Sequence, residues 1–142
     1  MADPSTLERF VSAQAPLFDQ ALAELTAGRK RSHWMWFIFP QLRGLGVSAT
    51  AEHFGIADLA EARAYLAHPL LGARLQRCTE AVLALEDCNL RSIFGAPDDV
   101  KFASSMTLFG VASDEPDSAF QRAIARCCGG RMDPRTLQML GS

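Results

Sequence analysis

The chain has 142 residues, of which 49% are hydrophobic and 21% are charged, so it is long and apolar enough to fold as a single domain, residues 1–142, around one core. A formal net charge of -2 gives no overall attraction to nucleic acid or to anionic membranes. No apolar run approaches the roughly 20 residues of a membrane span and the N-terminus lacks a secretory-signal pattern, so we expect a cytoplasmic protein without a membrane partner.

Residues that start and stop helices divide the chain into about seven to eight short helices. Asp3-Pro4 predicts the first helix, Pro16 should interrupt it, and Gly28 should end the second. Further starts are indicated at Ser48, Asp58, Pro69, Asn89 or Asp87, Pro97, Pro116 and Asp133. No strand pair is evident. We therefore expect an all-α fold, a compact orthogonal array of short helices, with the amphipathic segment 70–85 as its central helix.

The four cysteines, Cys78, Cys88, Cys127 and Cys128, have spacings that fit no metal-binding template. Cys78 lies on the apolar face of segment 70–85, where a thiol is a small core residue. We expect reduced, structural thiols and no metal site.

Segment 28–46, GRKRSHWMWFIFPQLRGLG, concentrates the residues with the most chemical interest: Arg29, Lys30, Arg31, His33, Trp34, Trp36, Gln41 and Arg43. Arginine donates paired hydrogen bonds to phosphate or carboxylate, and an indole offers a face for stacking. Segment 28–46 therefore predicts a site for a flat, anionic ligand, with one tryptophan in the core and one against the ligand. The alternatives without a ligand are that the basic residues form a solvated surface and that both tryptophans belong to the core.

A second group of polar residues starts the helix expected after Pro97. Asp98 and Asp99 are typical helix-capping acids, but Lys101 and Ser105 follow within two turns and can line a ligand site. His33 and Asp99 are the acid–base candidates, although a lone histidine is more often structural. Four residues, Gln41, Arg43, Lys101 and Ser105, are predicted ligand contacts beside the basic cluster.

The same segment, together with AYLAHPLLGARLQRC (64–78), SIFGAPDDVKFASSMTLF (92–109) and FVSAQ (10–14), resembles the bacterial family called domain of unknown function 1810. The resemblance implies a mainly helical, single-domain bacterial protein without an assigned activity. Some members are labelled calpastatin-like, but this chain contains no inhibitor repeats that would support the label. The chain is also remotely similar to the helical NADAR domains, which are associated with NAD and ADP-ribose. The catalytic residues of those domains cannot be matched to positions in this sequence.

These observations are consistent with two hypotheses about function. The leading hypothesis is a helical domain that binds a nucleotide, an ADP-ribose-like compound or a sugar phosphate, and that, if it is an enzyme, is a hydrolase or N-glycosidase. The alternative is a protein-interaction module anchored by the apolar HWMWFIF segment. No P-loop or dinucleotide fingerprint is present, so no cofactor is expected. Nucleic acid is an unlikely partner, and the oligomeric state, including a homodimer, stays open.

Overall fold

The computed structural model describes residues 7–141, and within them the fold is all-α, as predicted. Its ten helices are α1 (Glu8–Gln14), α2 (Phe18–Thr26), α3 (Met35–Ile38), α4 (Ala49–Phe54), α5 (Leu59–Ala67), α6 (Leu71–Leu83), α7 (Leu90–Phe94), α8 (Asp98–Ala112), α9 (Ala119–Cys127) and α10 (Pro134–Gly141). They exceed the expected seven to eight, and the helix that no predicted start marked is the single turn α3. The one β feature of the described range is an isolated parallel bridge between Leu42 and Ile56.

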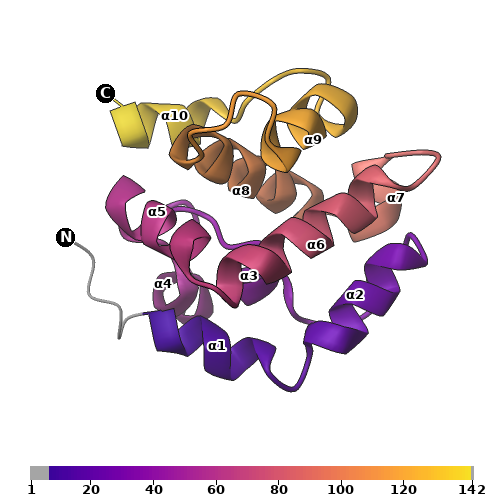
Figure 1. The fold of residues 1–142 in the computed structure, drawn as a ribbon, viewed down its shortest axis with the longest axis horizontal. Coiled ribbons are helices and arrows are strands. Elements are labelled where there is room, and N and C mark those ends of the chain that lie inside the picture. The colour runs from indigo at the N-terminus through magenta and orange to yellow at the C-terminus, as the bar shows by residue number, and fades with distance from the viewer. Residues whose placement is uncertain (1–6, 142) are drawn as a thin grey trace.

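The most buried helix of the fold is α8, while the amphipathic segment 70–85 forms α6, which is a second main packing element. Helices α5, α7, α9 and α10 all pack against α8 (Figure 1). Nine of its 15 residues are buried, because apolar and small side chains surround its axis. Helix α6 is amphipathic, so it packs against α2, α5 and α9 and exposes its other face. No helix between residues 7 and 141 is both long and apolar enough to cross a membrane.

Local capping explains where most helices begin. The side chains of Ser48, Asp58 and Asn89 accept hydrogen bonds from backbone N–H groups in the first turns of α4, α5 and α7. Gly28 ends α2 with a left-handed φ of 83°. One predicted start is wrong: Ser118, not Pro116 and Asp117, caps α9. The start predicted at Asp3-Pro4 lies outside the described residues.

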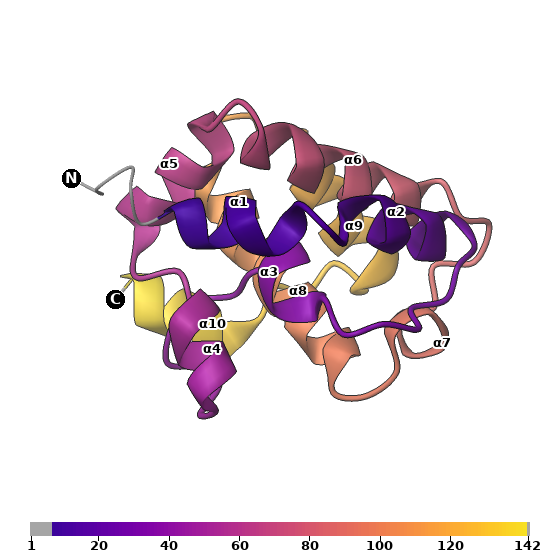
Figure 2. The same cartoon turned by 90° about the horizontal axis from the view of Figure 1, so that it is seen from below.

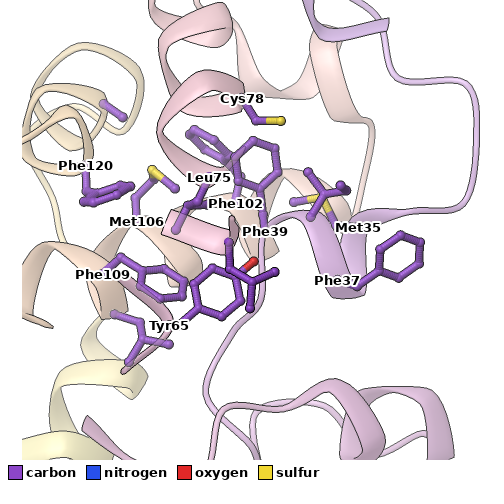
Figure 3. Close-up of a cluster of buried hydrophobic side chains, with 14 of the residues drawn as sticks. Met35, Phe37, Phe39, Tyr65, Leu75, Cys78, Phe102, Met106, Phe109 and Phe120 are labelled. Atoms are coloured by element: carbon purple, nitrogen blue, oxygen red, sulfur yellow. The ribbon is translucent and has the colours of Figure 1, made fainter. Parts of the chain in front are cut away.

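The tryptophan-rich segment forms the centre of the core. Helix α3 lies between α1 and α8 in both views of the molecule (Figures 1 and 2). Phe39, which follows α3, places its ring centroid 5.8 Å from that of Phe94 and 5.0 Å from that of Phe102. Figure 3 shows the rings of Phe39 and Phe102 among the core side chains of α5, α6 and α8. The segment therefore joins the first helices to α7 and α8.

A buried amide ties α1 to the same segment. The side-chain Nε2 of Gln14 donates to the carbonyl oxygen of Phe37 at 2.7 Å and lies 2.9 Å from the Tyr65 hydroxyl. Arg74 donates to Gln14 Oε1 at 3.4 Å. Because Gln14 is only 1% exposed, these bonds are what makes its burial tolerable. Gln14 thus fixes the end of α3 relative to α1 and α5.

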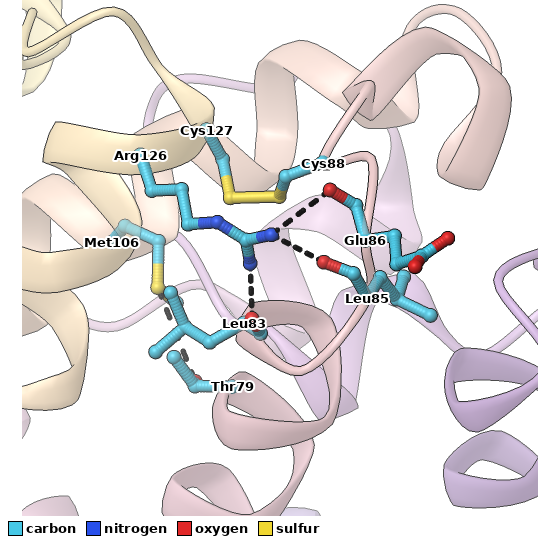
Figure 4. The surroundings of a disulfide bond; sticks show 8 residues. All are labelled: Thr79, Leu83, Leu85, Glu86, Cys88, Met106, Arg126 and Cys127. Atoms are coloured by element: carbon cyan, nitrogen blue, oxygen red, sulfur yellow. Dashed lines mark hydrogen bonds between the residues drawn. A yellow bond between two sulfur atoms is a disulfide. The ribbon is translucent and has the colours of Figure 1, made fainter.

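A disulfide between Cys88 and Cys127 joins the loop after α6 to the end of α9, and so the expectation of four reduced thiols is wrong (Figure 4). The guanidinium of Arg126 lies beside the disulfide and donates to the carbonyl oxygens of Leu83, Leu85 and Glu86. The spacing of the cysteines gave no hint of this pair, since they are 39 residues apart in the chain. Only the packing of α9 against α6 brings them together.

Counting thiols tests this pairing. In denatured but unreduced protein we expect a thiol reagent to modify two cysteines per chain, Cys78 and Cys128, and all four after reduction. In the folded protein both free thiols should react slowly, because burial raises the pKa of Cys78 to about 12 and that of Cys128 to about 11. Four reactive thiols in the unreduced, denatured chain would contradict the disulfide.

Candidate functional site

The loop that carries the basic cluster is organised by one carboxylate, Glu24, at the end of α2. Its Oε1 accepts from the backbone N–H groups of Arg31 at 2.7 Å and Ser32 at 3.0 Å, and from the indole Nε1 of Trp34 at 3.0 Å. Its Oε2 accepts from the Ser32 hydroxyl at 2.7 Å and from Gln20 at 3.1 Å. Burial alone would raise the pKa of Glu24, but these hydrogen bonds lower it to about 2.

Trp34 consequently belongs to the core and offers no face to a ligand. It is 0% exposed, its N–H is bonded to Glu24, and the ammonium of Lys30 lies 5.2 Å from its ring centroid. This corrects its assignment as a ligand contact. Trp36, by contrast, is partly exposed and lies toward the first turn of α8.

Asp98 links the tryptophan segment to α8 through two lysines. Its Oδ2 lies 3.0 Å from Lys30 Nζ, and its Oδ1 lies 3.5 Å from Lys101 Nζ. Lys101 in turn lies over the Trp36 ring, 4.9 Å from the centroid. Lys30 thus forms an ion pair with Asp98 and lies against the Trp34 ring. The sequence assigned Lys30 to ligand binding, but its charge is already used by these two contacts. Lys101 is held more loosely and is the more exposed of the two.

Two adjoining hollows share Gln41 and Lys101. The smaller, about 10 Å³, is lined by Met35, Trp36, Phe39, Gln41, Ala51, Phe54, Gly55 and Lys101. The larger, about 190 Å³, is called the α8 cleft below and is lined by Gln41, Leu45, Gly46, Pro97, Val100, Lys101, Ser104, Asp133 and Arg135. The α8 cleft lies between the loop before α4, the first half of α8 and the start of α10. Three predicted residues, Trp36, Gln41 and Lys101, line these hollows.

Helical spacing explains which side of α8 faces the cleft. Pro97, Val100, Lys101 and Ser104 are separated by three and four positions, so they share one face of the helix. Ser105, the predicted ligand contact, lies outside this face. It is 0% exposed, and its hydroxyl has no hydrogen-bond partner among residues 7–141. Its assignment to the site is therefore corrected by one position, to Ser104.

Asp133, at the start of α10, contributes a carboxylate to the α8 cleft. Its Oδ2 accepts from Ser104 Oγ at 3.0 Å, from the backbone N–H of Thr136 at 3.2 Å and from the Thr136 hydroxyl. Its own N–H donates to Thr107 Oγ1 at 2.8 Å. Within residues 7–141 no group donates to Asp133 Oδ1. One oxygen thus holds the helix start while the other is available in the cleft.

Arg135 supplies the second cation of the cleft. It is exposed, and it forms no ion pair or hydrogen bond with another side chain in the described part of the chain. The side-chain amide of Gln41 is likewise without a hydrogen-bond partner there. Two cations and a free amide therefore line a concave surface, as an anion site requires.

The remaining predicted residues line neither hollow. Arg29, Arg31 and His33 are exposed on the loop that Glu24 holds, and Arg43 is exposed with its Nε donating to the carbonyl oxygen of Glu52 at 3.1 Å. Asp99 lies 3.4 Å from Arg91 Nε. Of these residues only Asp99 is adjacent in sequence to a residue that lines the cleft, Val100.

Sequence reasoning missed Asp133 and Arg135, and it chose Ser105 over the neighbouring Ser104. The helical spacing from Lys101 was a sufficient signal for Ser104. For Asp133 and Arg135 the sequence indicated only a helix start, because nothing local shows that α10 packs against α8. Among residues 7–141 no group of three His, Cys, Asp or Glu side chains is arranged to hold a metal ion.

Another hollow, of about 340 Å³, lies between α5 and the end of α8. Its charged residues are Arg63, Asp114 and Glu115, so acids outnumber bases there. An anion is therefore disfavoured in this hollow and favoured in the α8 cleft.

Comparison with known proteins places almost the whole chain in one family and one fold. The family model described as "Protein of unknown function (DUF1810)" matches residues 4–140. The crystal structure of the conserved hypothetical protein Rv1873 from Mycobacterium tuberculosis is similar to this chain with 51% sequence identity and a TM-score of 0.94, covering 99% of each chain. No curated protein matches the sequence.

Proposed function

The chain belongs to the DUF1810 family of proteins of unknown function, and from the geometry of its site we propose that it binds a small anionic ligand, a nucleotide or sugar phosphate, in the α8 cleft. The observation that supports this proposal is the pair of cations in one concave surface, Lys101 and Arg135. Phosphate oxygens accept charge-assisted hydrogen bonds from such groups.

The two cations are prepared for this role in different ways. Lys101 is positioned by the Asp98 carboxylate and the Trp36 ring, so little of its conformational freedom is lost on binding. Arg135 has no competing partner among the described residues, so a ligand gains its hydrogen bonds without breaking others. The proposal thus moves the anion site from the basic cluster at 29–31 to the α8 cleft.

Binding, and not hydrolysis, is what we propose. His33 and Asp99, the acid–base candidates, line neither hollow, so neither is placed to touch a ligand held by Lys101 and Arg135. The alternative of a protein-interaction anchor loses its support for a separate reason. Within HWMWFIF, Trp34, Met35, Phe37, Ile38 and Phe39 are at most 7% exposed. An anchor must be exposed before its partner binds.

The cytoplasmic location is also part of the proposal, because sugar phosphates and nucleotides are intracellular compounds. The Cys88–Cys127 disulfide is the feature that argues in the opposite direction, since disulfides persist mainly in oxidising compartments.

Calorimetric titration with ribose 5-phosphate, AMP and inorganic phosphate tests the binding site. We expect at least one of them to bind, and Arg135→Gln and Lys101→Gln each to weaken binding by about 10- to 100-fold, because each removes a charge-assisted hydrogen bond worth about 1.5–3 kcal/mol. Arg135→Gln is the cleaner variant, since no partner within the described chain loses a bond.

The matched controls are Arg29→Gln and Arg31→Gln, which remove one positive charge each from the exposed loop. They should leave the affinity within about twofold, since neither side chain lines the α8 cleft and salt screens exposed charges that make no contact with a ligand. If no ligand binds at millimolar concentration, or if the control variants weaken binding as much as Arg135→Gln does, the proposed site is wrong.

A further inference from the structure

The α8 cleft contains a carboxylate that a site for a bare anion would not need. Asp133 lines the same surface as Lys101 and Arg135. A negative charge within a few ångströms of a bound phosphate weakens its binding. Asp133 in the cleft therefore favours a ligand that carries a hydrogen-bond donor as well as the phosphate.

The hydrogen bonds of Asp133 show which of its oxygens is available to such a donor. All three donors within residues 7–141, the Ser104 hydroxyl and the N–H and hydroxyl of Thr136, are bonded to Oδ2. These bonds fix the plane of the carboxylate and leave the acceptor capacity of Oδ1 unused by the described chain. Oδ1 is thus a pre-positioned, charged acceptor in the wall of the cleft.

We propose that Asp133 makes the α8 cleft selective for phosphate monoesters that carry a hydroxyl group, that is, for sugar or polyol phosphates. Lys101 and Arg135 hold the phosphate, and a ligand hydroxyl donates to Asp133 Oδ1. This inference rests on the proposed function, because it assumes that the two cations bind the phosphate. It goes further by assigning the chemical class of the rest of the ligand.

Charge and size support this class over two others. The cleft and its immediate ion pairs contain three cations, Lys30, Lys101 and Arg135, against two carboxylates, Asp98 and Asp133, so the balance favours a net anion over a neutral zwitterion such as an amino acid. Its volume of about 190 Å³ is that of about six waters at roughly 30 Å³ each. A single sugar phosphate fits that volume better than ADP-ribose or a dinucleotide does, and ligand sites for larger molecules typically exceed about 300 Å³.

Two probes and one variant test this selectivity. Methyl phosphate supplies the phosphate without a hydroxyl, and ribose 5-phosphate supplies both. In the native protein we expect ribose 5-phosphate to bind about tenfold or more tightly than methyl phosphate, as a charge-assisted hydrogen bond predicts. Because this comparison needs no substitution, it stays decisive even if a variant fails to fold.

Asp133→Asn should remove most of this preference. The amide oxygen can accept the three bonds now made to Oδ2, so α10 keeps its start, while the amide NH₂ replaces the acceptor Oδ1. We expect methyl phosphate to bind severalfold more tightly, because a like charge is removed, and ribose 5-phosphate to lose most of its advantage. Tighter binding of methyl phosphate by the variant cannot arise from a general loss of structure.

The outcomes separate the inference from the proposed function. If both phosphates bind through Lys101 and Arg135 with equal affinity, or if Asp133→Asn leaves their ratio unchanged, the cleft is an anion site and the selectivity is wrong. If neither phosphate binds at millimolar concentration, the proposed function and the selectivity both fail.

Discussion

Replacing Phe39 by alanine is expected to lower the free energy of unfolding by about 3–5 kcal/mol, the range for removing a large aromatic side chain from a packed core. Phe39 is 1% exposed, and its ring contacts three others, those of Trp34, Phe94 and Phe102. The cavity left by alanine would lie where the tryptophan segment meets α7 and α8. Urea denaturation followed by circular dichroism measures the change.

Two further substitutions make that result specific. Phe39→Leu keeps much of the buried volume and should lose clearly less stability than alanine. Val100→Ala removes methyl groups from a residue of the α8 cleft that is 60% exposed, and should change the stability by less than about 0.5 kcal/mol. If Phe39→Ala were as mild as Val100→Ala, the segment would not be the centre of the core.

The second large effect is expected at Glu24. Glu24→Ala should lower the free energy of unfolding by about 3–5 kcal/mol, the range for removing one partner of a buried charged interaction. The reason is that the N–H groups of Arg31 and Ser32 and the buried indole N–H of Trp34 all lose their acceptor. The near-ultraviolet circular dichroism of the tryptophans should change with it, because Trp34 loses the bond that fixes its ring.

Acid should destabilise the native protein through the same carboxylate. The folded pKa of Glu24 is about 2, against an ordinary value of 4.5, so the unfolded chain binds a proton first as the pH falls. The stabilisation is therefore complete above pH 4.5 and is lost as the pH falls from 4.5 towards 2. Unfolding free energies measured across this range should fall steeply in the native protein.

Glu24→Gln removes the titration while retaining one acceptor oxygen for the loop. Its stability should depend less on pH between 4.5 and 2 than that of the native protein. Asp114→Asn, at an exposed carboxylate, should leave the native pH dependence unchanged. Equal acid sensitivity of Glu24→Gln and the native protein would show that other groups carry the effect.

Local chemistry accounts for what could be predicted of the fold. Ser48, Asp58, Asn89 and Gly28 act within one turn of their own helix ends, so sequence is sufficient to locate those ends. The choice of α8 as the central helix depends on which faces meet, and amphipathicity points instead to α6. An amphipathic helix is easily recognised by the periodic spacing of its apolar residues. A buried central helix has apolar or small side chains on every face, so its sequence shows no such periodicity.

Prediction of the candidate site from sequence fails for the same reason, because residues far apart in the chain are brought together only by helix packing. Trp36, Gln41 and Lys101 were found because unusual residues gathered near them in sequence. Asp133 and Arg135 are joined to them only by the packing of α10 on α8. In the basic cluster at 29–31, Lys30 forms an ion pair with Asp98, and the neighbouring Trp34 donates to Glu24, so neither group is free for a ligand.

These assignments give the conspicuous segment 28–46 a mainly structural role. Its carboxylate-held loop and aromatic side chains hold α1, α2, α7 and α8 together, and only Trp36, Gln41, Leu45 and Gly46 with the core residues Met35 and Phe39 reach a hollow. Ligand specificity would then reside in residues on α8 and at the start of α10, which are less conspicuous in the sequence.

The most direct test is to locate a bound sugar phosphate on the folded protein by amide chemical shifts in a titration with ribose 5-phosphate. The α8 cleft predicts saturable shifts at residues 41–46, 100–104 and 133–135, with residues 29–33 unchanged. Shifts confined to residues 29–33, or none anywhere at millimolar ligand, would contradict an anion site formed by Lys101 and Arg135.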